Sequence, residues 1–216
     1  ALRSIVLHIR KLDQASTGVW LLVCWLVAVS YSVVEIHRAW PVFQRMAAIA
    51  FHEPEPMPEL LVVDDQLYVS GEFSYGSGRL FKRTLTSNPQ LTTVHFDVTG
   101  GHLHDARLIA QHIAQLQLNT HVTERCYGNC MLAYIGGYYR TAADDADFKF
   151  YEYLNYYNGY RSDWLIYREQ VKDQQYFVQR GVTVAMSYQL YYEHSNHEAF
   201  NPSTEELRRS YFVNKS

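Results

Sequence analysis

The sequence VHFDVTGG at residues 94–101 decides the fold of this chain. It reads as an apolar strand that ends in a glycine pair. A helical segment follows at 102–116, then a second short strand at 119–124 and the compact turn CYGNC at 126–130. Strand, glycine turn, helix, strand and turn make a βαβ unit, and folds of this kind keep their chemistry in the turns after the strands. The stretch therefore predicts an α/β domain with a site near these two turns.

The segments on both sides of this unit alternate between strand and helix patterns, which supports the α/β class. A polar, flexible loop is expected at 74–78 (SYGSG), where the spacing does not match a phosphate-binding loop. Ser203 with Glu206 three residues later is a helix-start signal. The expected strands are 60–65, 66–71, 139–142 and 146–151, and the expected helices are 78–87, 131–137, 164–180, 184–194 and one beginning near 203.

Composition limits the possible functions. The 216 residues leave room for one domain of about 150 residues with appendages. A net charge of −3 gives no electrostatic argument for a nucleic-acid partner. Fourteen of the 18 tyrosines fall between Tyr127 and Tyr192. Tyrosine favours half-buried surfaces, so this clustering indicates either an interaction surface or a tyrosine-rich core.

The N-terminal region contains an apolar segment. Gly18 to Val34 are seventeen residues without a charge, which is the lower limit for a membrane-spanning helix. A buried core helix and a cleaved signal peptide are the alternatives. We expect a signal anchor at 17–36 that enters the lipid bilayer, preceded by a flank at 1–16.

Basic residues set the expected orientation of this anchor. Arg3, Arg10 and Lys11 precede it, against Arg38 and Arg45 after it, so the C-terminal body is expected on the far side of the membrane. That predicts a single-pass protein of the bacterial inner membrane with its body in the periplasm, or, as an alternative, a mitochondrial membrane protein. An interfacial helix and a proline-rich spacer are expected at 37–59, and the folded domain at 60–216.

The order of the motifs resembles the Clp-protease-like branch of the crotonase superfamily, in particular its exported or membrane-anchored members. The resemblance covers about residues 62–213. It is carried by VSG at 69–71, the DVTGG turn at 97–101, HDA at 104–106, the CYGNC turn, Gly136-Gly137 with Arg140, and NPSTEEL at 201–207. It implies a spiral of ββα units with a helical C-terminal part.

The resemblance also assigns site positions. It implies that Gly100 and Gly101 form the oxyanion-binding turn. The family's nucleophilic serine lies in a pattern similar to Cys-x-Ser-Ala-Cys, which places Gly128 at the serine position. The catalytic histidine ends a later strand, which places Tyr151 at that position. Glycine has no hydroxyl and tyrosine is a poor base at neutral pH, so both replacements argue against hydrolysis.

The leading hypothesis is therefore a membrane-anchored, catalytically inactive Clp-protease-like protein. It would act as a binding or scaffold subunit of a membrane complex or homo-oligomer, with no cofactor. In an exported body, Cys126 and Cys130 are expected to form a disulfide across the tight turn. The alternative for these cysteines is a reactive Cys130 thiolate with His102, His104 or His121 as its base.

Two enzymatic alternatives are kept open. One is a serine or cysteine hydrolase with a relocated nucleophile at Ser74, Ser77 or Cys130. The other is crotonase-type acyl-CoA chemistry with Glu152 or Asp144 as acid and base. No metal site is expected, because the clusters at 102–105 and 193–198 lack the HExxH arrangement.

Overall fold

The computed structural model describes residues 23–40, 43–44, 56–151, 153, 160–192 and 199–215. The chain divides into two compact units, Ala1–Pro54 and Glu55–Ser216. In the first unit, residues 23–40 form a helix. Among the described residues, no helix has both the length and the apolar character needed to cross a membrane. The first residues of the expected anchor, 17–22, lie outside the described part of the chain.

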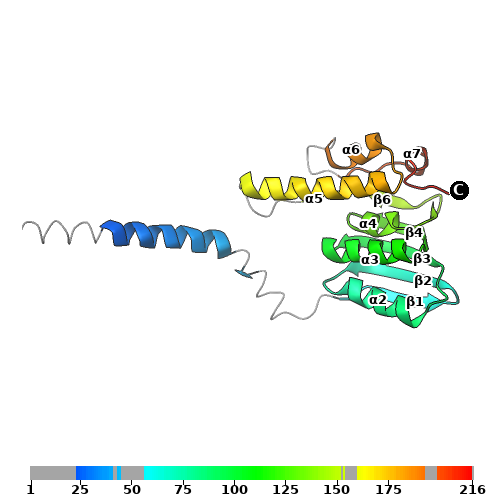
Figure 1. The fold of residues 1–216 in the computed structure, drawn as a ribbon. Helices are drawn as coiled ribbons and strands as arrows, with labels where there is room; N and C mark the ends of the chain where they lie inside the picture. Colours follow the sequence, from blue (N-terminus) through cyan, green and yellow to red (C-terminus); the bar gives the residue numbers. More distant parts are fainter. Residues whose placement is uncertain are drawn as a thin grey trace, which may run out of the picture. The chain divides into compact units, whose positions relative to one another are not determined.

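The second unit is a mixed α/β domain built on a six-stranded sheet, shown in Figure 1. The antiparallel hairpin of β1 (Glu59–Val63) and β2 (Gln66–Phe73) forms one edge. The central strands β3 (Thr93–Gly101) and β4 (Asn119–Tyr127) run parallel to β2. The short strands β5 (Arg140–Ala142) and β6 (Asp147–Lys149) both pair with β4 in parallel.

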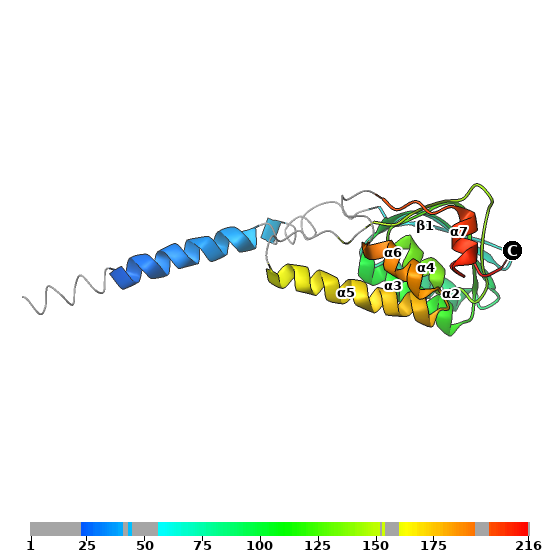
Figure 2. The ribbon, with the colours of Figure 1, turned by 90° about the horizontal axis from the view of Figure 1, so that it is seen from above.

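Three helices cover one face of this sheet, as Figures 1 and 2 show: α2 (Ser77–Ser87), α3 (Leu103–Gln115) and α4 (Cys130–Ile135). The strands alternate, so one face is apolar and turned toward these helices. Val94, Phe96 and Val98 of β3 are fully buried there, together with Ile109 and Ile113 of α3. This layer of helices on a sheet is the core that fixes the turns after β3 and β4.

The C-terminal helices complete the domain. They are α5 (Tyr160–Gln179), α6 (Val184–Tyr192) and α7 (Thr204–Arg209). The capping box expected at Ser203 and Glu206 is present, with reciprocal hydrogen bonds between side chain and backbone.

A buried arginine joins this C-terminal part to the sheet. Arg140 at the start of β5 is 2% exposed and donates to the carbonyl oxygens of Phe212 (2.9 Å), Gly137 (3.2 Å), Arg180 (3.1 Å) and Tyr211 (2.7 Å). Burial lowers the pKa of Arg140 to about 10, so it stays charged at neutral pH.

The sequence-based α/β assignment is confirmed, although several element boundaries shift. β4 extends to Tyr127, and β6 ends at Lys149. The segment 74–78, expected as a flexible loop, is instead packed: Ser74, Ser77 and Gly78 are buried, and α2 already begins at Ser77. A long-range contact with Asp105, described below, holds it in place.

Candidate functional site

The glycine turn at the end of β3 has the backbone geometry that only glycine adopts easily. Gly100 and Gly101 have φ angles of 121° and 115°. A Cβ atom on Gly101 would lie 2.2 Å from the carbonyl oxygen of Phe73. Both polar groups of the peptide bond between Gly101 and His102 are in hydrogen bonds. The His102 N–H donates to the Phe73 carbonyl oxygen at 2.6 Å, and the Gly101 carbonyl accepts from the Asn129 amide at 2.6 Å. The N–H groups that the resemblance assigns to oxyanion binding, those of Gly100 and Gly101, lie at the end of β3.

The turn between β4 and α4 lies against this glycine turn. The Asn129 bond just described joins the two turns, and a Cβ atom on Gly100 would lie 3.6 Å from the Tyr127 carbonyl oxygen. The expected disulfide between Cys126 and Cys130 is present, with Cα atoms 5.3 Å apart and both side chains fully buried. The Cys130 sulfur is therefore bonded and covered, and the structure does not place it as a reactive thiolate.

Gly128 and Tyr151, the two positions assigned to a nucleophile and a base, come together in the fold. Gly128 has a φ of 52°, and a Cβ atom built on it would lie 3.4 Å from Cδ2 of the Tyr151 ring. The Gly128 N–H donates to the Lys149 carbonyl at 2.7 Å, which holds the turn against the end of β6. Where a hydrolase would need a hydroxyl and an imidazole, this chain presents a bare backbone and a half-exposed phenol ring.

A polar cluster lies beside this pair. The Tyr127 hydroxyl donates to Asp147 at 2.6 Å, and Lys149 approaches Asp147 at 3.0 Å. The hydrogen bond from Tyr127, followed by those from Lys149, lowers the pKa of Asp147, while the bond to Asp147 raises the pKa of Tyr127. The lowered pKa makes Asp147 a weaker base than an ordinary carboxylate, and Tyr127 stays protonated, so neither is suited to act as a catalytic base at neutral pH.

A histidine–aspartate pair follows the glycine turn directly. Asp105 is buried, and its Oδ2 atom lies 2.6 Å from His102 Nδ1. Its Oδ1 atom accepts from the backbone N–H groups of Gly76 (3.2 Å) and Gly78 (2.8 Å). The carboxylate thereby connects the start of α3 to the start of α2. This His–Asp pair was not predicted from the sequence, although its spacing of three residues at a helix start was an available signal. Nothing local signals the bonds to Gly76 and Gly78.

The serines proposed as relocated nucleophiles form no hydrogen bond with the His102–Asp105 pair. Ser74 donates to the Pro56 carbonyl, and Ser77 donates to the Ser74 carbonyl at 2.7 Å. Within the described residues, the hydrogen bond between an aliphatic hydroxyl group and an imidazole ring joins Thr141 to His121, at 2.8 Å. It lies in mid-sheet, away from the glycine turn, so no nucleophile–base–oxyanion arrangement results.

The carboxylates considered for acyl-CoA chemistry are poorly placed. The Asp144 side chain is 96% exposed and pairs with Arg208 at 3.1 Å. Glu152 lies outside the described residues. A solvated, ion-paired carboxylate lacks the covered position that a catalytic acid needs.

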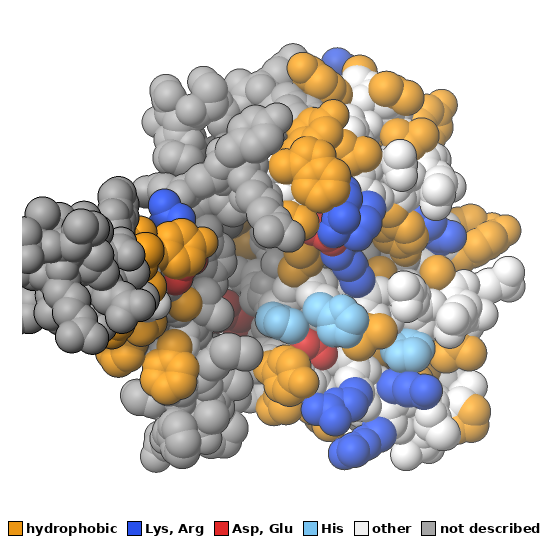
Figure 3. All heavy atoms as spheres, turned by 60° about the vertical axis from the view of Figure 1, so that its left-hand side comes forward, with side chains coloured by type: hydrophobic (Ala, Val, Ile, Leu, Met, Phe, Trp, Pro, Cys, Tyr) orange, Lys and Arg blue, Asp and Glu red, His pale blue; other side chains and the backbone are white. Residues whose placement is uncertain are grey.

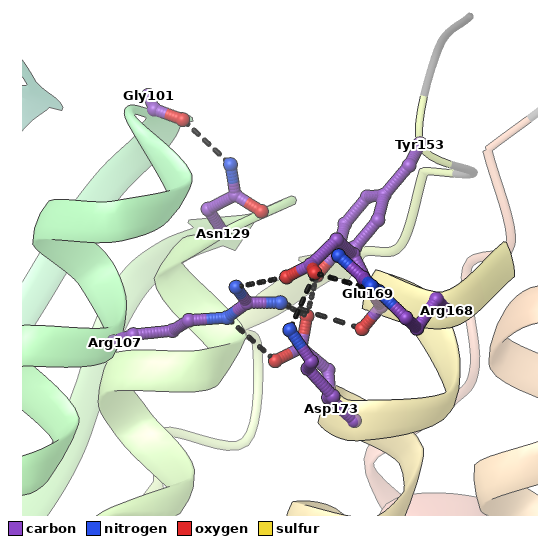
Figure 4. A network of polar contacts seen from close by, with 8 residues as sticks. Gly101, Arg107, Asn129, Tyr153, Arg168, Glu169 and Asp173 are labelled. Atoms are coloured by element: carbon purple, nitrogen blue, oxygen red, sulfur yellow. Dashed lines mark hydrogen bonds and ion pairs between the residues drawn. The ribbon is translucent and has the colours of Figure 1, made fainter. Parts of the chain in front are cut away.

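A paired charge network joins α3 to α5 (Figure 4). Arg107 binds Asp173 through two hydrogen bonds of 2.8 and 2.7 Å and Glu169 through one of 2.6 Å, and the Tyr153 hydroxyl also donates to Asp173. Burial disfavours the charge of Arg107, but the hydrogen bonds that it donates to Asp173 and then to Glu169 outweigh this effect and raise its pKa. The network borders a pocket of about 200 Å³ that Arg107, Lys172 and Tyr176 help to line. The opposite charges of this network neutralise one another, so its role is to hold α3 against α5.

Two further histidines lie side by side on the central strands. No group of three or more His, Cys, Asp or Glu side chains in the described part of the chain could hold a metal ion. His95 and His121 are neighbours on adjacent strands, with ring centroids 5.1 Å apart, and Tyr68 stacks on His95 at 4.5 Å. The cluster at 193–198 falls outside the described residues.

Comparison with known proteins identifies the fold. No family model and no curated protein matches the chain. Solved structures do match: ClpP1 from Listeria monocytogenes has a TM-score of 0.57 at 12% identity, covering 70% of this chain and 89% of its own. A mutant of the same ClpP1 gives 0.56 at 13% identity, covering 70% of this chain and 90% of its own.

A third solved structure is a mutant of the 1510-N membrane-bound stomatin-specific protease. It has a TM-score of 0.52 at 12% identity and covers 71% of this chain and 80% of its own. The domain thus has a ClpP-like fold, as the sequence motifs had implied. At these identities the similarity establishes the fold and leaves the activity to be argued from the site.

Proposed function

We propose that this chain is a membrane-anchored, catalytically inactive Clp-protease-like protein. It acts by binding, as a scaffold subunit of a membrane protein complex or as a homo-oligomer. The observation that carries the proposal is the contact of Gly128 with Tyr151 beside the Gly100–Gly101 turn. The ClpP-like spiral of ββα units supplies an oxyanion-type turn, but neither position beside it carries a nucleophile or a base.

Rebuilding the site tests this assignment. The double variant Gly128→Ser, Tyr151→His would restore a hydroxyl beside an imidazole, and we expect it to take up a fluorophosphonate probe that the wild-type chain does not. The two single variants serve as controls, because each lacks one partner of the pair. A double variant that melts like the wild type and still takes up no probe would refute the assignment of these two positions.

Three observations support an exported, membrane-attached location. A disulfide within the domain suits an oxidising compartment such as the periplasm. The apolar sequence from Gly18 to Val34 supplies the proposed anchor. The structural neighbour described as membrane-bound is a precedent for this fold at a membrane. An alkaline carbonate wash tests the anchor: the intact chain should stay in the membrane pellet, and its release would end the proposal.

Exposed apolar side chains support the binding role. Trp164, Leu165 and Tyr167 on α5 are 51%, 41% and 55% exposed. Large exposed apolar side chains gathered on one segment are typical of interaction surfaces. We assign this face of α5 to self-association or to a subunit of the complex.

A hydrolase with a relocated nucleophile is the second candidate, and one observation favours it. His102 is held by the buried Asp105 directly after the glycine turn, as a catalytic base would be. The hydroxyls of Ser74 and Ser77 are turned to backbone carbonyls instead. Probe labelling of the wild-type chain that is lost in His102→Gln would favour this candidate.

A further inference from the structure

The point at which the chain enters the domain lies against α2. The carbonyl of Pro56 accepts a hydrogen bond from the Ser74 hydroxyl, just before the helix. The terminal methyl of Met57 lies 3.3 Å from a Cβ atom built on Gly76, the residue that caps α2. The first described residues of the domain therefore pack at the start of α2.

The outer face of α2 is basic and lacks acidic neighbours in sequence. Arg79, Lys82 and Arg83 are exposed at helical spacings of three and four, so they share one face. The sequence between Phe73 and Phe96 contains no Asp or Glu. Within the described residues, none of the three cations forms an ion pair. Figure 3 shows Lys and Arg side chains gathered along the lower edge of this side of the molecule, below a group of histidines.

The buried carboxylate next to α2 does not neutralise this face. Asp105 on the adjacent α3 is buried, and its two oxygens are occupied by the N–H groups of Gly76 and Gly78 and by His102. The three positive charges of α2 are therefore available to bind a partner outside the domain. This holds although the whole chain carries a net charge of −3.

Apolar groups flank the basic face at the entry corner. Tyr75 is 63% exposed and Met57 49% exposed. The Arg79 guanidinium lies 5.9 Å from the centre of the Tyr75 ring. A tyrosine and a methionine beside arginine and lysine side chains match the headgroup region of a bilayer, where rings and alkyl stems are covered and charges meet phosphate.

We propose that the α2 face, defined as Met57, Tyr75, Arg79, Lys82 and Arg83, docks on an anionic lipid surface. The proposal rests on the membrane anchor argued above. The expected spacer at 37–59 tethers the domain to that anchor. The tether keeps the local lipid concentration high, and each Lys or Arg strengthens binding to anionic lipid about fivefold.

The test uses the full chain in vesicles of phosphatidylcholine alone or with added phosphatidylglycerol. A fluorophore on Thr86→Cys, at an exposed position of α2, reports contact through quenching by headgroup-labelled lipid. The background is Cys24→Ser, since Cys24 is a free thiol. A second label on Glu205→Cys of α7 serves as the remote control. We expect quenching at Thr86→Cys only with phosphatidylglycerol at low salt, because salt screens exposed charges.

Charge reversal gives the matched comparison. Arg79→Glu with Arg83→Glu should weaken the quenching response at least about 25-fold in lipid titration, from the same fivefold per charge. Arg209→Glu with Lys215→Glu, at exposed positions elsewhere, should leave it unchanged. Equal quenching in both vesicle types, or an unchanged response after the α2 reversal, would overturn the docking proposal. Salt-sensitive binding to an acidic protein without any response to phosphatidylglycerol would overturn it too.

The carbonate wash separates this proposal from the anchor. If the chain stays in the pellet but the Thr86→Cys label is never quenched, the docking alone fails. If the wash releases the chain, the anchor fails, and docking is then measured as binding of the released chain to preformed phosphatidylglycerol vesicles. Binding that the α2 reversal does not weaken would refute the docking in that case as well.

Discussion

At the scale of single residues, Arg140 shows how much of this fold depends on one buried side chain. It satisfies carbonyl oxygens from the end of α4, from the end of α5 and from the residues after α7. Removal would leave these acceptors buried without partners, at about 1–3 kcal/mol each. We therefore expect Arg140→Met to lower the free energy of unfolding by at least about 3 kcal/mol in denaturant titration.

Arg209→Met is the control for this variant, because Arg209 is an exposed arginine with one surface ion pair to Glu205. It should change the free energy of unfolding by less than about 0.5 kcal/mol. Equal effects of the two substitutions would show that the Arg140 contacts do not carry the stability assigned to them.

The neighbouring histidines of the sheet predict a pH dependence. Burial lowers the pKa of both His95 and His121, and the charge of His121 lowers that of His95 further. In the unfolded chain both should titrate near their ordinary value of about 6.5. As the pH falls through that value, the unfolded state takes up protons first, so the folded state loses stability. Above a pH of about 6.5, the full contribution of the two neutral histidines to the stability of the folded state is present.

The variant that tests this is His95→Phe, which keeps a ring for Tyr68 to stack on. We expect the wild-type free energy of unfolding to fall between about pH 6.5 and 5, and to fall less steeply in the variant. Parallel curves for the two proteins would rule out His95 as a source of the dependence.

At the scale of elements, the two turns that form the candidate site are held by different devices. The β3–α3 turn depends on glycine, since a Cβ atom on Gly101 would overlap the Phe73 backbone. Gly181, after α5, shares a positive φ of 91° but has nothing within 4 Å of its Cβ position. Gly181→Ala should cost about 1 kcal/mol from backbone strain alone. Gly101→Ala should cost several times more, as measured by thermal unfolding.

The β4–α4 turn depends on the disulfide. Closing a loop this short should stabilise the domain by about 2 kcal/mol through the unfolded state. We expect Cys126→Ala with Cys130→Ala, or reduction of the wild type, to lower the free energy of unfolding by that amount. Cys24→Ser should have no such effect, because Cys24 is exposed and unpaired. Reduction that changes neither stability nor the thiol count would mean that the bond is absent in solution.

The central βαβ unit was predictable because its signals are local. Alternation in Val94–Val98, the glycine pair and the cysteine turn all lie within a few residues of what they specify. The packed segment at 74–78 was not predictable, because its order comes from Asp105, 27 residues beyond Gly78. The same reason applies to the bonds of Arg107 to Asp173, 66 residues away, and to the Arg140 contacts: their partners lie far away in the sequence. Long-range hydrogen bonds depend on tertiary packing and leave no periodic trace in the sequence.

At the scale of the whole molecule, two surfaces carry the proposed function. The α2 face is assigned to lipid, and the exposed apolar face of α5 to protein contacts. We expect Trp164→Ser with Leu165→Ser to shift the detergent-solubilised chain toward a smaller assembly in light scattering, because both side chains are largely exposed. Val184→Ser, another exposed apolar position, is the control. An unchanged mass in the double variant would exclude this face from self-association.

The ClpP-like fold and the absence of a nucleophile–base pair beside Gly100 and Gly101 together make the central claim. Its most direct test is peptide mapping by mass spectrometry after treating the full chain, with Cys24→Ser, with fluorophosphonate and iodoacetamide probes. We predict no adduct anywhere between residues 56 and 151. An adduct on Ser74, Ser77 or Cys130 that is lost on unfolding, or on changing His102, would show an active hydrolase and contradict the claim.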